Sequence, residues 1–160
     1  MMELMIVMAI VSIMAGALFV SVNKSAGTKD VENAAQQIST QLKTLQNEAL
    51  TGKMIEELPA GSGIFAPACR FVFESFADSY NIKYDRNCSG IPDYIGGTTT
   101  VDMIKKKVKL DGHIIFFSSP RGEIAGSVEI VVTSAKDNSV KKYVNINSAG
   151  NISILDASAG

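Results

Sequence analysis

The sequence lacks the groups on which most enzymes and metal proteins depend. Its 160 residues include one histidine, His113, two cysteines and no tryptophan. A histidine-based metal cluster is therefore excluded, and two cysteines do not make a Cys-based zinc site without other partners. The glycine pair Gly96-Gly97 is followed by three threonines, which is typical of a turn rather than of a phosphate-binding loop. We therefore expect no catalytic residues, no cofactor and no metal site.

A large excess of charge of one sign is also missing, since 15 Lys and Arg face 16 Asp and Glu. The chain as a whole has no strong attraction to nucleic acid or to anionic surfaces, and we do not expect nucleic acid as a partner. The local exception is a basic cluster of Lys105, Lys106, Lys107 and Lys109, which could contact nucleic acid or an acidic partner. Alternation along a strand would send these lysines to both faces, so a lysine-rich edge strand that resists unwanted pairing is the favoured interpretation.

Charge is absent from one long segment, Leu4 to Val22. A helix of this length is about as long as a bilayer is thick, at about 1.5 Å per residue against about 30 Å of hydrocarbon. A secretory signal would show a basic region first, whereas the only charge that precedes this segment is Glu3. The pattern predicts a hydrophobic helix over residues 1–23 that spans a membrane or fills a filament core.

The pattern becomes amphipathic after Asn23, which predicts that the same helix continues over residues 24–53 and ends at Gly52. A separate helix after a linker at residues 25–28 is the alternative. The apolar positions recur at spacings of three and four and are Val31, Ala34, Ala35, Ile38, Leu42, Leu45, Ala49 and Leu50.

Residues 54–160 are predicted to form a β-rich globular head after a loop at residues 59–63. The segments 70–76 and 80–86 read as a hairpin with Asp78 and Ser79 as its two-residue loop. This register sets Phe73 opposite Tyr84 and Cys69 opposite Cys88, which predicts a disulfide. The apolar side chains that it places on one face are Phe71, Phe73, Tyr80, Ile82 and Tyr84.

Further strands are expected at residues 101–110, 113–117, 128–133, 143–146 and 152–155, with Gly150 as the left-handed residue of a three-residue loop between the last two. The predicted fold class is α+β, with a long N-terminal hydrophobic and amphipathic α-helix packed on an antiparallel β-sheet head.

The segment ELMIVMAIVSIMA, residues 3–15, resembles the N-terminal signature of the type IV pilin superfamily, which includes pilus subunits and the pseudopilins of type II secretion. In that family a prepilin peptidase cleaves the precursor, the new N-terminus is methylated, and a glutamate neutralises the terminal amine of a neighbouring subunit. The resemblance assigns this assembly role to Glu3. The proline that commonly breaks the family's helix is missing near Val20, which leaves Gly16 and Gly27 as the candidate weak points.

Three later segments, residues 45–49, 114–122 and 144–152, are similar to H-type pseudopilins and FimT-type minor pilins. The resemblance implies a structural subunit of a type IV pilus or type II secretion pseudopilus. Its implied partners are other pilin subunits, an inner-membrane assembly platform, the peptidase, and membrane lipid before assembly. The implied location is a single-pass membrane protein with an external head, and then the filament. The alternative is a minor pilin or tethered head that binds DNA or surfaces.

Overall fold

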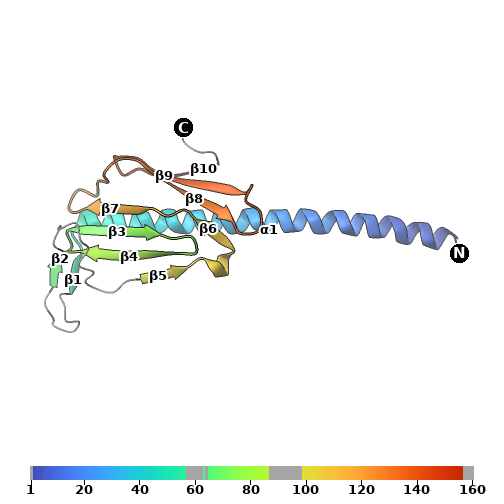
Figure 1. Ribbon diagram of the computed structural model, residues 1–160, viewed down its shortest axis with the longest axis horizontal. Helices are drawn as coiled ribbons and strands as arrows, with labels where there is room; N and C mark the ends of the chain where they lie inside the picture. Colours follow the sequence, from blue (N-terminus) through green and yellow to red (C-terminus); the bar gives the residue numbers. More distant parts are fainter. Residues whose placement is uncertain (1, 57–62, 64, 87–98, 157–160) are drawn as a thin grey trace.

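The computed structural model describes residues 2–56, 63, 65–86 and 99–156. Its α-helix, α1, runs from Met2 to Thr51. The helix passes through residues 25–28 without a break, so the alternative of two helices joined by a linker is wrong, and Gly16 and Gly27 both lie within it. Only the second half of α1 packs on the head, and the first half extends far beyond it (Figure 1).

The C-terminal end of α1 is set by Gly52, as the sequence predicted. Gly52 has a φ of +63°, a backbone conformation that residues with a Cβ adopt only at a cost in free energy. Its N–H donates to the carbonyl of Ala49 at 3.3 Å, and the N–H of Lys53 donates to that of Glu48 at 3.0 Å. These bonds pair carbonyls that the last turn of a helix otherwise leaves free.

The predicted apolar stripe of α1 is buried from Val31 to Ala49, each of its side chains being at most 1% exposed. Leu50 is the exception, with 49% of its surface exposed. Leu50 lies beside Gly122 instead, where its Cγ is 3.0 Å from the position that a Cβ on that glycine would take. The stripe therefore faces the head, and its last predicted member lies at the margin.

The expectation of a helix on a single antiparallel sheet is wrong, because the described strands form three separate sheets. A small sheet pairs β1 (Met54–Glu56) with β2 (Phe65–Pro67). The second sheet has the order β5-β4-β3-β7, with bounds Thr99–Asp102, Ser79–Asp85, Arg70–Ser75 and Ile114–Ser118. The third has the order β10-β9-β8-β6, with bounds Ile152–Leu155, Lys141–Ile146, Val128–Ser134 and Val108–Leu110.

The chain changes sheets inside the segment that we expected to be one strand, residues 101–110. A 3₁₀ turn, η1 (Ile104–Lys106), separates β5 from β6. Lys107 follows it with a φ of +57°, which redirects the chain so that β6 pairs with β8 instead of extending the first sheet. Met103, fully buried, fastens this turn to the core.

The β3–β4 hairpin forms, but the predicted register is wrong by two residues. Phe73 pairs with Ile82 rather than with Tyr84, because Phe76 and Ser79 close the turn through a 2.8 Å bond and leave Ala77 and Asp78 as the loop. A shift of two keeps every side chain on its original face. The predicted aromatic face therefore still points into the core, with the Phe73 ring stacked on Tyr80 at a centroid distance of 5.0 Å.

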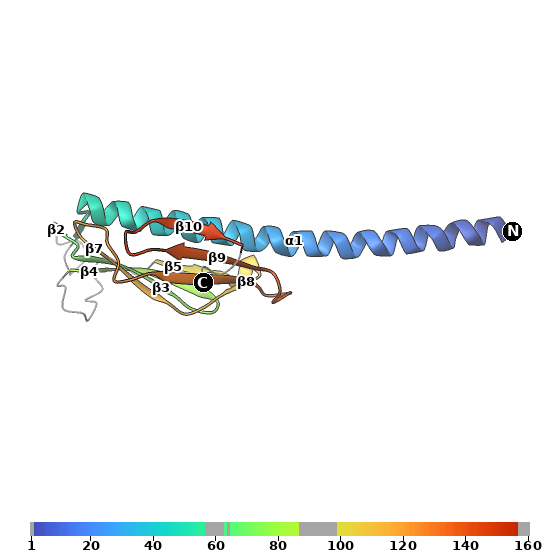
Figure 2. The ribbon, with the colours of Figure 1, turned by 90° about the horizontal axis from the view of Figure 1, so that it is seen from above.

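The core lies between one side of α1 and the inner faces of the two four-stranded sheets, as Figure 2 shows from above. The side chains that fill its centre come from every layer. The largest of them are Ile38, Leu42, Leu45, Phe71, Phe73, Tyr80, Met103, Ile115, Phe117, Ile130 and Ile146.

Candidate functional site

The most unusual surface of the molecule is the first half of α1, whose described apolar side chains pack on nothing in the head. The exposed fractions are 63% for Met8, 51% for Ile10 and 74% for Ile13. At about 100° per residue, Met8 and Ile10 point to nearly opposite sides of the helix. We call this surface the apolar rod; its described members are Val7, Met8, Ile10, Val11, Ile13 and Met14.

Among the described residues, however, no helix meets the length and hydropathy required for a membrane crossing. This finding overturns the expectation of a single-pass membrane protein.

Glu3, the predicted assembly residue, lies in the first turns of α1. Its side chain is outside the described part of the structure. The role that the resemblance gives it therefore stays a prediction.

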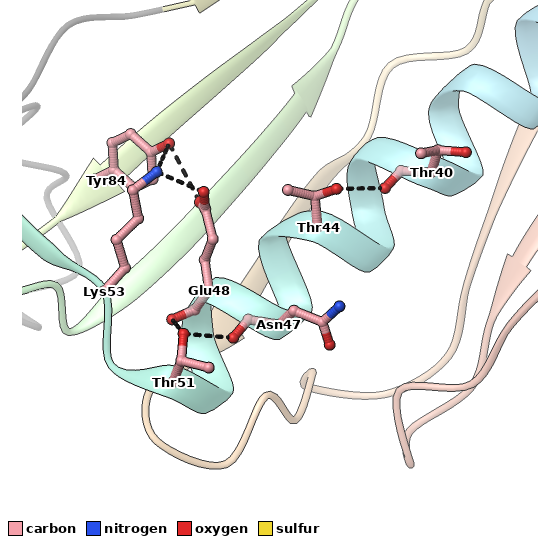
Figure 3. Close-up of polar contacts among 7 residues, drawn as sticks. All are labelled: Thr40, Thr44, Asn47, Glu48, Thr51, Lys53 and Tyr84. Carbon is pink, nitrogen blue, oxygen red and sulfur yellow. Dashed lines mark hydrogen bonds and ion pairs between the residues drawn. The ribbon is translucent and has the colours of Figure 1, made fainter.

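The second half of α1 presents an open polar face, on which three threonine hydroxyls are bonded to the helix itself. The hydroxyls of Thr40, Thr44 and Thr51 donate to the carbonyls one turn earlier, at 2.8, 3.0 and 2.9 Å. Figure 3 shows the bonds that Thr44 and Thr51 donate. Because these hydroxyls are satisfied within the helix, the threonines can meet a neighbour without needing new hydrogen bonds.

The end of α1 is fastened to the head by Glu48, Lys53 and Tyr84 (Figure 3). The Lys53 ammonium donates to Glu48 Oε1 at 2.5 Å and to the Tyr84 hydroxyl at 3.3 Å, and that hydroxyl donates to Glu48 Oε2 at 3.4 Å. Partial burial of Lys53 opposes its charge, but the hydrogen bonds to Glu48 and Tyr84 prevail and raise its pKa above the usual value. Lys53 is 40% exposed, so water screens the pair and its net contribution is about 1 kcal/mol or less. This cluster orients the helix end more than it stabilises it.

Cys69 is disulfide-bonded. Its predicted partner Cys88, the other cysteine of the chain, lies outside the described residues. The observed β3–β4 register, continued by one residue beyond Asp85, would place Arg86 and not Cys88 nearest to Cys69 across the hairpin. The prediction that Cys69 and Cys88 lie directly opposite each other on the two strands is therefore wrong.

The predicted basic cluster is not one edge strand. Lys105 and Lys106 lie in η1, Lys107 follows with positive φ, and Lys109 lies on β6 at the edge of its sheet. Lys109 is in register with Thr133, which is in register with Lys141, so two lysines share a row on the outer face. The carboxylate of Asp111 lies in the next row of the same face and pairs with His113.

The His113 side chain pairs with the carboxylate of Asp111. Its Nε2 is 2.8 Å from Asp111 Oδ2, and Asp111 Oδ1 accepts from the N–H of Val131 at 2.7 Å. Ser75, buried at the end of β3, donates from its hydroxyl to the Asp111 carbonyl at 2.7 Å. These bonds join β3 to β8 across the crossover from β6 to β7. In the described part of the chain, no three His, Cys, Asp or Glu residues gather around a metal position.

The sequence pattern did not predict a second contact between α1 and the head, which is made by Gln46. The Gln46 side chain donates to the carbonyl of Gly122 at 3.5 Å, and its Nε2 lies against Gly150. One helix position thus holds the loop after β7 and the loop between β9 and β10. The alternation of apolar residues does not predict such a contact. The sequence did predict a positive φ at Gly150, which lies in one of these two loops.

Comparison of the chain with protein-family models, with curated proteins and with solved structures found no match.

Proposed function

We propose that this chain is a structural subunit of a pilin-like filament, in which the first half of α1 packs against the same helix of other copies. The single observation that carries the proposal is the apolar rod. It projects beyond the folded head, and its described side chains are more than half exposed.

The distribution of the rod's side chains favours an assembly of many copies over a dimer. A contact between two helices covers a stripe about 100° wide on each. Because Met8 and Ile10 point to nearly opposite sides, covering both requires helices on more than one side. Each buried Å² of apolar surface contributes about 25 cal/mol, so a bundle of several helices is the favoured arrangement.

Two further features support this proposal. The resemblance of residues 3–15 to the type IV pilin signature falls on the same stretch of helix. The open face of α1 beyond it carries threonines whose hydroxyls are already bonded to the helix. These hydroxyls can therefore adjoin a neighbouring subunit at little cost in desolvation.

The proposed mechanism is mechanical rather than chemical. The head packs on α1 through the stripe from Val31 to Ala49, which leaves residues before it to associate. In the filament, the rods would form a common apolar core and the heads its outer surface. Whether the filament is a pilus or a secretion pseudopilus is a finer assignment that depends on the subfamily resemblance alone.

The test is a charge placed in the rod of the full chain. In Ile13→Lys the ammonium would enter the shared core, where an unpaired charge costs several kcal/mol. We expect the variant to form no fibres by negative-stain electron microscopy and to sediment as a small species, while its circular dichroism stays that of the wild type. The side chain of Ile13 is 74% exposed, so the fold of a single copy does not depend on it.

Ile104→Lys is the matched control, because Ile104 is also apolar and 64% exposed but lies on η1 in the head. This variant should assemble as the wild type does. Normal fibres from Ile13→Lys would refute the proposal, and so would a wild-type chain that forms only a closed oligomer of fixed mass.

A further inference from the structure

We draw no further inference here: the strongest candidate, the row of lysines that Lys109 and Lys141 form on the outer face of the sheet β10-β9-β8-β6, carries nothing because the carboxylate of Asp111 lies in the next row and nothing in the structure shows what covers this face.

Discussion

Gln37 of α1 donates a hydrogen bond of 3.1 Å from its side-chain amide to the phenol oxygen of Tyr80 on β4. Tyr80 is fully buried, stacked on Phe73. Burial raises the pKa of the Tyr80 hydroxyl above its usual value, and the bond from Gln37 opposes this only in part. Loss of the Tyr80 proton at high pH would therefore leave a charge in the core between helix and sheet, at a cost that the bond from Gln37 offsets only in part.

The first prediction concerns alkaline stability. Because the folded chain holds the Tyr80 proton more tightly than the unfolded chain does, this stabilisation is complete below about pH 10. It is lost as the pH rises through the raised pKa. Tyr80→Phe has no such proton, so its free energy of unfolding should fall less above about pH 10 than that of the wild type. At neutral pH the variant should be about 1 kcal/mol less stable, through the lost hydrogen bond.

Denaturant titrations at a series of pH values measure this difference. Tyr143→Phe is the control, since it removes a phenol from a half-buried position on β9 instead of from the core. If the free energies of unfolding of Tyr80→Phe and the wild type fall in parallel above about pH 10, the Tyr80 phenol does not cause the loss of stability at high pH.

The second prediction separates backbone strain from crowding at the junction on Gln46. Gly150 has a φ of +80°, and a Cβ there would lie 2.1 Å from Gln46 Nε2 and 3.2 Å from the Gly122 carbonyl. Gly126 has a φ of +96° with nothing within 4 Å of such a Cβ. Gly126→Ala should therefore show the backbone cost alone, about 1–2 kcal/mol, and Gly150→Ala a larger loss.

Thermal or urea unfolding of both variants provides the comparison. If the excess in Gly150→Ala comes from displacement of the amide, then Gln46→Ala should remove part of it, and the double variant should be more stable than the sum of the single losses indicates. Equal losses for the two glycine variants would contradict the crowding at Gln46.

Local pattern was enough to predict the elements that have a strong period or an obligatory turn residue. The stripe from Val31 to Ala49 repeats at three and four and is buried as predicted. Gly52 and Gly150 stand where the chain needs a positive φ. The aromatic face of the β3–β4 hairpin was also predicted, because alternation survives a register shift of two.

The features of the fold that the sequence pattern did not predict depend on contacts between segments far apart in the chain. The run from Val101 to Leu110 has the composition of one strand, and its division between two sheets turns on Lys107, a residue type that rarely adopts positive φ. The hairpin register was misjudged because Ala77-Asp78 and Asp78-Ser79 are both credible loops. The Asp111–His113 pair reads locally as two ordinary surface residues, and its bonds to Ser75 and Val131 come from the folded topology.

The third prediction concerns Glu3. If the carboxylate neutralises a neighbour's terminal amine, as the resemblance implies, then Glu3→Ala should fold normally but enter filaments poorly. Glu32→Ala is the matched control, because Glu32 is an exposed glutamate farther along the same helix. The measurement is the fraction of each variant in sedimented fibres when it is mixed with wild-type chain. Equal incorporation of Glu3→Ala and Glu32→Ala would remove the special role of Glu3.

The last prediction is that folding and assembly depend on different halves of α1. The buried residues of the core begin at Val31 among the described side chains, and the described members of the apolar rod are exposed. A chain of residues 24–160 should therefore remain soluble, sediment as a monomer and unfold cooperatively. A chain of residues 40–160 should not, because it also lacks Val31, Ala34, Ala35 and Ile38, and an isoleucine truncated in a core alone costs about 2–5 kcal/mol. Circular dichroism melting and sedimentation velocity distinguish the two. If the 24–160 chain is molten, the rod is needed for folding. If the 24–160 chain still forms fibres, the rod is not the assembly surface.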